Sequence, residues 1–153
     1  MTTPMHSPAE LTQAVVAYFE SLTPQSLSQL ADLYAAQARF KDPFNEVQGL
    51  QSIEAIFDHM FRSLVNPRFV VTTQVLEGHQ CFLTWDFLFA TGAGARRSEF
   101  TVRGATHLVY ALQEDGHWRI ALHRDYWDVA EELYEKLPVL GALMRWLKRR
   151  ARS

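Results

Sequence analysis

The sequence predicts an α+β fold in which a strongly curved antiparallel sheet, shaped as a cone, packs on three N-terminal helices. Apolar residues recur at helical spacing as far as residue 64. From residue 68 to residue 127 they alternate with polar residues at a period of two, and short turns interrupt this pattern. Helical spacing then returns. The predicted order is therefore α-α-β-α-β-β-β-β, followed by a helical extension.

The length and composition fit a single domain. A chain of 153 residues with 48% hydrophobic content can bury a sizeable core without disulfide bonds or structural metal ions. We place the main domain at residues 1–128 and treat residues 129–153 as its amphipathic, basic extension. The formal net charge of −2 gives no general attraction to nucleic acid, so we expect no nucleic-acid partner. Because Cys81 is the only cysteine and residues 1–8 lack the apolar run of a secretory signal, we expect a cytoplasmic protein.

Three helices are predicted in the N-terminal part of the chain. The first begins at Ser7 and Pro8, a capping residue followed by a proline suited to the first turn, and ends near residue 22. Thr23 and Pro24 repeat this signal and start a second amphipathic helix. The third follows Gly49. Each helix has one apolar face, which is expected to pack against other apolar residues.

Four strands follow, and their short connections predict how they pair. Their predicted bounds are Phe69–Leu76, Gln80–Ala90, Ser98–Leu112 and His117–Trp127. Consecutive strands joined by such tight turns pair antiparallel, which gives a meander. A sheet with strands of this length must curl, and the curl leaves a hollow on the face that the helices cover.

Helical spacing after residue 127 predicts an extension that Pro138 breaks into residues 130–137 and 139–150. Five of the 15 bases and none of the 17 acids lie in the last nine residues. A basic amphipathic helix of this kind could lie on an anionic membrane or dock on a partner protein. We favour the simpler interpretation, in which the helix covers apolar surface and keeps its charges in water; peripheral membrane contact is the less favoured alternative.

The order of elements over residues 8–127 resembles the nuclear transport factor 2 fold. Within that fold, Tyr18 on the first helix and Asp42-Pro43 after a short strand over residues 38–42 resemble the ketosteroid isomerase-like and SnoaL-like branch. In the isomerases the corresponding Asp moves a proton next to a ketone, while the Tyr and a second acid donate hydrogen bonds to the enolate. The resemblance implies these roles for Asp42 and Tyr18. Thr106 stands where the second acid falls, which argues against steroid isomerisation itself.

Both residues also have a structural interpretation. An Asp before a proline is typical of a turn in which the carboxylate bonds its own backbone, and this applies to Asp42. A tyrosine on an apolar stripe is typical of a core residue whose hydroxyl reaches a backbone carbonyl, and this applies to Tyr18. The sequence leaves both interpretations open.

His123 and Asp125 form a second candidate pair. Period-two alternation places both on one face of the last strand, together with Trp127, and the resemblance turns that face towards the cavity. Cyclase-like relatives use an acid on this strand. The pair could be a general acid and base, part of a metal site or a buried hydrogen-bonded couple. No second His-x-His or His-x-x-x-His motif adds ligands and no glycine-rich loop precedes a helix, so we expect neither metal nor cofactor.

Two classes of function follow. The first is a cofactor-independent isomerase, cyclase or dehydratase acting on a small hydrophobic carbonyl compound, with Asp42, Tyr18, Asp125 and His123 as catalytic residues. The alternative is a non-catalytic module of the same fold that binds a small apolar molecule or dimerises. Because relatives of this shape are commonly dimeric, we expect a homodimer that pairs through the sheet. The residues expected to line the pocket are Trp85, Phe87, Thr106, Trp127, Phe57 and Phe61.

Overall fold

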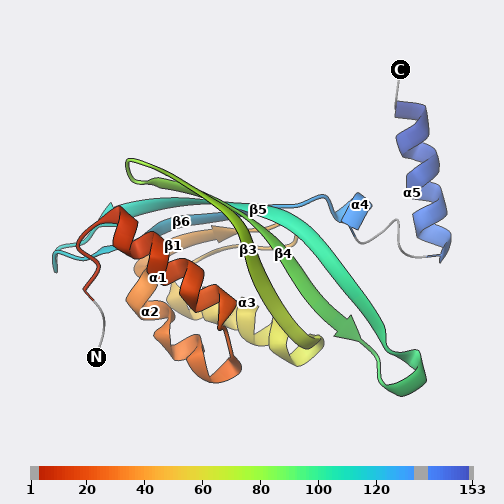
Figure 1. The fold of residues 1–153 in the computed structure, drawn as a ribbon, viewed down its shortest axis with the longest axis horizontal. Coiled ribbons are helices and arrows are strands. Elements are labelled where there is room, and N and C mark those ends of the chain that lie inside the picture. Colours follow the sequence, from red (N-terminus) through yellow and green to blue (C-terminus); the bar gives the residue numbers. More distant parts are fainter. Residues whose placement is uncertain (1–3, 133–137, 152–153) are drawn as a thin grey trace.

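One curved, unclosed sheet of six strands carries the fold (Figure 1). The computed structural model describes residues 4–132 and 138–151. The strands lie in the order β2-β1-β6-β5-β4-β3. Their bounds are β1 Tyr34–Lys41, β2 Glu46–Gln48, β3 Val65–Glu77, β4 Gln80–Thr91, β5 Ser98–Leu112 and β6 Trp118–Tyr126. The predicted α+β class is confirmed.

The last four strands form the antiparallel meander that the short turns predict. β3 pairs with β4, β4 with β5, and β5 with β6. β1 extends this sheet by pairing in parallel with β6, with Phe40 opposite His123. The parallel pair was not predicted; it can form because the chain between β1 and β6 is long enough for the crossover that parallel strands need. The short strand β2, antiparallel to β1, was also missed.

The chain enters β1 four residues before the predicted strand start. The spacing of Leu27, Leu30 and Leu33 indicates a second helix that includes Tyr34, but this segment forms a 3-10 helix, Pro24–Gln29, and one α-helical turn, α2 (Leu30–Leu33). From Tyr34 onwards, pairing with β6 outweighs the helix propensity of an alanine-rich stretch. This change of element leaves the Tyr34 side chain fully buried.

Two longer helices cover the inner face of the sheet. α1 (Pro8–Glu20) begins as predicted, with Ser7 Oγ accepting a hydrogen bond from the backbone N–H of Glu10 at 3.2 Å. It ends two residues before the predicted position. α3 (Leu50–Ser63) follows Gly49. Figure 1 shows α1, α2 and α3 on the same side of the sheet.

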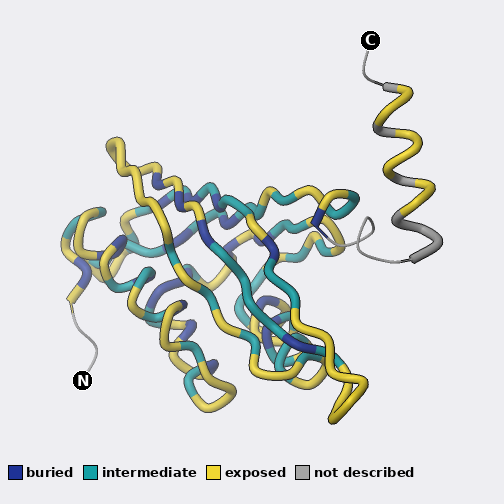
Figure 2. Tube along the Cα trace, turned by 45° about the vertical axis from the view of Figure 1, so that its right-hand side comes forward, coloured by how far each residue is buried: buried dark blue, intermediate teal, exposed yellow. Residues whose placement is uncertain are grey.

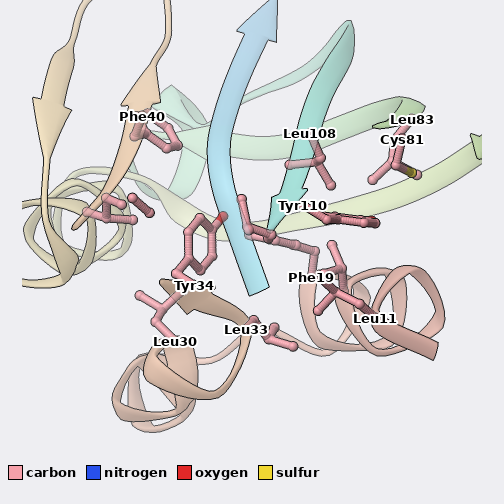
Figure 3. Close-up of a cluster of buried hydrophobic side chains, with 14 of the residues drawn as sticks. Leu11, Phe19, Leu30, Leu33, Tyr34, Phe40, Cys81, Leu83, Leu108 and Tyr110 are labelled. Carbon is pink, nitrogen blue, oxygen red and sulfur yellow. The ribbon is translucent and has the colours of Figure 1, made fainter. Parts of the chain in front are cut away.

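The core lies between these helices and the concave face of the sheet. Figure 3 shows buried side chains of the helices and strands meeting there. The alternating apolar side chains of β4 face this core: Leu83 and Trp85 are buried, and Phe87 and Phe89 pack against it. The largest fully buried side chains are Tyr34, Tyr110, Phe40, Leu11, Leu30, Ile53, Leu108, Ile120, Val15 and Cys81.

The outer face of the sheet is the more exposed one. Figure 2 shows long exposed stretches along the outer strands and at the hairpin tips. Val75 and Phe82, which lie opposite each other on β3 and β4, are among the exposed apolar residues. The homodimer expected at this face stays a prediction.

The C-terminal extension contains α4 (Val129–Glu132) and α5 (Pro138–Ala151). The helix predicted over residues 130–137 falls partly in α4, and residues 133–137 lie outside the described residues. Figure 1 shows α5 standing apart from the sheet and from α1 to α3. The expectation that this helix covers apolar surface gets no support from Leu143, Trp146 and Leu147, which are exposed.

In the two described ranges of the chain, no helix is both long enough and apolar enough to cross a membrane.

Candidate functional site

An apolar cavity lies between the concave face of the sheet and helices α1 and α3. Its volume is about 30 Å³, or about 410 Å³ when crevices and the open space at its mouth are included. Its polar side chains, Thr106, His123 and Asp125, come from β5 and β6. The other lining residues are Val15, Phe19, Phe57, Phe69, Val71, Leu83, Trp85 and Leu108.

A chain of four hydrogen bonds runs along the polar wall of this cavity. Trp85 Nε1 donates to Thr106 Oγ1 at 2.8 Å, and Thr106 Oγ1 donates to Asp125 Oδ1 at 2.5 Å. His123 Nε2 lies 2.7 Å from the same oxygen of Asp125. The other ring nitrogen of His123, Nδ1, lies 2.7 Å from the hydroxyl of Tyr34. The chain therefore joins side chains of β4, β5, β6 and β1.

Strand register explains why these residues meet. His123 and Asp125 are two apart on β6 and so point to the same face. Thr106 on β5 lies directly opposite Asp125. Trp85 on β4 lies opposite Gly104, and a Cβ at Gly104 would clash with the Trp85 indole ring. The absence of a side chain at Gly104 thus lets the indole lie across β5 and reach Thr106.

The buried hydroxyl of Tyr34 is the hydrogen-bond partner of one ring nitrogen of His123 and bears on the tautomer of that ring. Burial, and then the nearby Asp125 carboxylate, raise the pKa of Tyr34 well above its usual value, so this hydroxyl stays protonated. Its hydrogen-bond partner is His123 Nδ1. If Tyr34 donates to Nδ1, the proton of the neutral imidazole is on Nε2 and is donated to Asp125. Asp125 Oδ1 then accepts two hydrogen bonds, which suits a carboxylate.

The second oxygen of Asp125 is open. Within the part of the chain that the structure describes, Asp125 Oδ2 accepts no hydrogen bond, and every fully enclosed side-chain nitrogen or oxygen has a partner. Oδ2 must therefore reach accessible space. The exposed fraction of the side chain is 19% for Asp125 and 6% for His123. Asp125 is thus the polar group that an incoming molecule can meet.

Asp125 also lines an outer groove at the end of β6. This groove is wider than the cavity and opens to solvent, with about 910 Å³ of free space. Asp125 belongs to both hollows and so marks where they approach each other. The other residues of the outer groove are Lys41, Asp42, Pro43, Arg124, Tyr126, Trp127 and Asp128.

The structure places Asp42 in a turn. Its Oδ1 accepts hydrogen bonds from the backbone N–H of Phe44 at 2.7 Å and of Asn45 at 2.6 Å, and both carboxylate oxygens accept from the Asn45 side chain at 3.1 Å. This is the turn geometry that an Asp before a proline predicts. Asp42 lines the outer groove and is not among the cavity-lining residues.

Tyr18 also lies away from the cavity lining. Its hydroxyl donates to the backbone carbonyl of Ser26 at 2.8 Å, and burial raises its pKa to about 12. Asp42, Tyr18 and Asp125 therefore do not meet at one cavity. The catalytic roles of Asp42 and Tyr18 stay predictions that rest on the family resemblance.

The residues expected to line the pocket divide between several places. Phe57, Trp85 and Thr106 line the cavity. Phe87 stacks on Phe69 with ring centroids 4.5 Å apart and is not a lining residue; Phe61 packs against the core. Trp127 lines the outer groove, where its ring packs edge-on against that of Phe44 with ring centroids 5.5 Å apart.

Sequence reasoning missed Tyr34 and Gly104. The helical spacing of the leucines before Tyr34 hides the start of β1, so its side chain appeared to belong to a helix. A weak signal for Gly104 was available, because a glycine inside a strand pattern often marks close approach of another group. That signal does not identify the group as Trp85.

His123 and Asp125 are the side chains of this site that could also bind a metal. Across the described ranges, no group of three or more His, Cys, Asp or Glu side chains is placed to hold an ion. What the pair offers on the present geometry is proton transfer and hydrogen bonding.

The SnoaL-like domain matches residues 15–123 of the chain. No curated protein matches it. Among solved structures, a candidate SnoaL-like polyketide cyclase from Jannaschia sp. CCS1 is 14% identical, with a TM-score of 0.66 over 86% of this chain and 92% of that one.

Two further solved structures are similar. A hypothetical protein with a ketosteroid isomerase-like fold from Catenulispora acidiphila, in complex with trimethylamine, is 18% identical, with a TM-score of 0.63 over 81% of this chain and 89% of that one. TsrD from Streptomyces laurentii is 19% identical, with a TM-score of 0.61 over 88% of this chain and 94% of that one. At these identities the similarity shows the shared fold, and the fold expected from the sequence is confirmed.

Proposed function

The chain belongs to the SnoaL-like domain family, and on that premise we propose that it is a cofactor-independent acid–base enzyme acting on a small apolar carbonyl compound. Asp125 is the base. Hydrogen bonds from His123 and Thr106 orient its carboxylate, and a hydrogen bond with Tyr34 orients His123. The reaction is proton removal from the carbon next to the carbonyl, followed by return of the proton to another atom.

The observation that carries this proposal is the state of the Asp125 carboxylate. Oδ1 has two hydrogen-bond partners, Thr106 Oγ1 at 2.5 Å and His123 Nε2 at 2.7 Å. Oδ2 has no hydrogen bond within the described chain and reaches accessible space, in a residue that lines both the apolar cavity and the outer groove. A base needs a free lone pair within reach of the proton it removes. Oδ2 meets this requirement.

The size of the cavity restricts what can react there. A volume of about 30 Å³ accommodates a small apolar group and not a large ring system. We therefore assign the reacting end of the substrate to the cavity and any larger remainder to the outer groove. Asp125, which lines both hollows, then stands at the reacting carbon.

The proposed step balances as a proton transfer. The C–H bond beside the carbonyl breaks, its proton moves to Asp125 Oδ2, and its electron pair forms an enolate. The Nε2–H of His123, on the same cavity wall, is the donor that we assign to the developing oxyanion once Asp125 has become neutral. Asp125 then returns the proton to a different carbon in an isomerisation, to an alkoxide in a ring closure, or to a departing hydroxyl group in a dehydration.

Hydrogen exchange tests this step without knowledge of the natural substrate. A panel of small enolisable ketones and aldehydes is incubated with the protein in D₂O, and deuterium uptake next to the carbonyl is followed by proton NMR. We expect the wild-type chain to accelerate exchange of at least one compound and Asp125→Asn to abolish the acceleration. Asp58→Asn, a change at a half-exposed carboxylate of α3 that lines neither hollow, is the matched control and retains it. An acceleration that persists in Asp125→Asn, or none for any compound, contradicts the proposal.

One observation supports a second candidate, the binding of a small organic cation without turnover. The rings of Phe19, Phe57, Phe69 and Trp85 line the cavity together with the Asp125 carboxylate. Aromatic faces and an anion attract an alkylammonium ion. The Catenulispora relative was solved in complex with trimethylamine. Calorimetry with trimethylamine and with neutral tert-butanol distinguishes the candidates, since only cation recognition prefers the amine and loses that preference in Asp125→Asn.

A further inference from the structure

We propose that α5 binds the surface of an anionic lipid bilayer and attaches the domain to it. This inference is independent of the function of the cavity. It rests on the exposed apolar side chains of α5 and on the basic residues that share the helix with them.

Three apolar side chains of α5 lie on one exposed face. Leu143, Trp146 and Leu147 are spaced by three and four residues, which places them within an arc of about 100° on a helix. Their exposed fractions are 50%, 43% and 45%. Figure 1 shows α5 separated from the body of the domain, and Figure 2 shows the described part of this helix as exposed. These side chains therefore face water in the isolated chain.

The C-terminal half of the helix also carries basic residues. Arg145 and Arg149 are one turn apart and fall on the side away from the apolar face. Arg150 lies over the ring of Trp146, with its guanidinium carbon 4.9 Å from the ring centroid. No acid occurs in the last nine residues, which carry five bases in all. The complementary surface is therefore both apolar and negatively charged.

An anionic bilayer fits this combination better than another copy of the chain or an acidic protein. Two copies of α5 would bring like charges together, which opposes pairing. Leucine and tryptophan side chains can enter the interfacial region of a bilayer without a shaped partner, while arginine side chains extend to the lipid headgroups. The 14-residue helix is long enough to lie in the interface over about four turns.

Co-sedimentation of the full chain with lipid vesicles tests the proposal. One vesicle type is phosphatidylcholine alone, and the other contains about a third phosphatidylglycerol. We expect binding to the anionic vesicles only, weakening as salt is raised because the attraction is screened. The fluorescence of Trp146 should shift to shorter wavelength on binding. A Trp146→Phe variant, which keeps an aromatic ring, should bind and lose that part of the shift.

Two variants separate the charged from the apolar contribution. Arg145→Gln/Arg149→Gln should weaken partitioning by about thirtyfold, from the usual contribution of a base near an anionic surface. Leu143→Ser/Leu147→Ser should weaken it by about tenfold or more. Circular dichroism of each variant checks that the domain remains folded.

The matched control changes two exposed bases on the body, Arg96→Gln/Arg103→Gln, and alters the net charge by the same amount. It should bind like the wild-type chain. Equal loss in the control and in the α5 variants overturns the proposal, because attraction would then depend on overall charge alone. Equal binding to neutral and anionic vesicles, or no binding to either, also overturns it and leaves an acidic protein as the partner to be sought.

Discussion

Replacing Tyr34 by phenylalanine tests the hydrogen-bond chain, because the change removes one hydroxyl and keeps the ring. Tyr34 is fully buried, and its hydroxyl lies 2.7 Å from His123 Nδ1. In the variant, Nδ1 of the buried His123 is left without this partner. A buried polar group left unpaired costs about 1–3 kcal/mol, so we expect the free energy of unfolding to fall by about 2 kcal/mol.

Tyr110→Phe is the matched control for this substitution. Tyr110 is also buried, and its hydroxyl lies 2.9 Å from Thr12 Oγ1. Thr12 Oγ1 still donates to the carbonyl of Pro8 at 2.9 Å when the tyrosine hydroxyl is gone. Because the threonine keeps this partner, we expect a smaller loss, of about 1 kcal/mol.

Urea unfolding followed by circular dichroism measures both losses. The midpoint should fall more for Tyr34→Phe than for Tyr110→Phe, while the slope of free energy against urea stays constant. Nitrogen NMR of His123 adds a readout that packing alone would not change: the Nε2–H tautomer should dominate in the wild-type chain and lose its preference in Tyr34→Phe. Equal losses for the two variants, together with an unchanged tautomer, would refute the assigned direction of the Tyr34 hydrogen bond.

Three further outcomes are expected. Burial raises the pKa of Tyr18 to about 12 and that of Tyr34 well above its usual value, so the folded chain keeps protons that the unfolded chain loses near pH 10. The free energy of unfolding should therefore fall as pH rises above about 10, and less steeply in Tyr34→Phe. Urea midpoints measured between about pH 9 and 11 test this. Gly104→Ala should lower the free energy of unfolding by about 1–3 kcal/mol, because the added methyl group clashes with the Trp85 indole. The loss should be smaller in a Trp85→Phe background, and an equal loss in both backgrounds would disprove that contact. Asp42→Ala should cost about 1 kcal/mol through lost turn hydrogen bonds and leave ketone exchange unchanged; a loss of exchange would restore Asp42 as a catalytic residue.

Local patterns in the sequence predict much of this fold. The predicted bounds of β5 agree with the structure, and the alternating apolar residues of β4 face the core. Both follow from period-two alternation, which a strand with one buried face must show. The antiparallel meander follows from short turns, which leave no other way for neighbouring strands to pair.

The parts that depend on distant pairing could not be predicted in this way. No local pattern indicates that β1 pairs with β6, and that pairing decides that Tyr34 belongs to a strand. The candidate site shows the same limit. Alternation placed His123 and Asp125 together, whereas the contact of Thr106 with Asp125 depends on the register between β5 and β6.

Strand register determines which side chains Thr106 contacts, and so changes how this residue is interpreted. Compared with the isomerase pattern, this position lacks an acid, which suggests a lost function. In the structure, the threonine hydroxyl accepts from Trp85 and donates to Asp125, so the acid of the site is supplied by the neighbouring strand and oriented by the threonine. The site can therefore hold a carboxylate in the cavity without an acid at residue 106.

The kind of donor around Asp125 decides what this carboxylate can do. In the described structure, Asp125 has no Lys or Arg partner; its hydrogen bonds come from a threonine hydroxyl and from an imidazole that is neutral when Tyr34 donates to it. A guanidinium partner would stabilise the negative charge strongly and make the carboxylate a poor proton acceptor. Neutral donors fix its position and leave its charge uncompensated beside an apolar cavity. That combination supports the proposed proton transfer, and it is the reason why Asp125, rather than Asp42, is the base in that proposal.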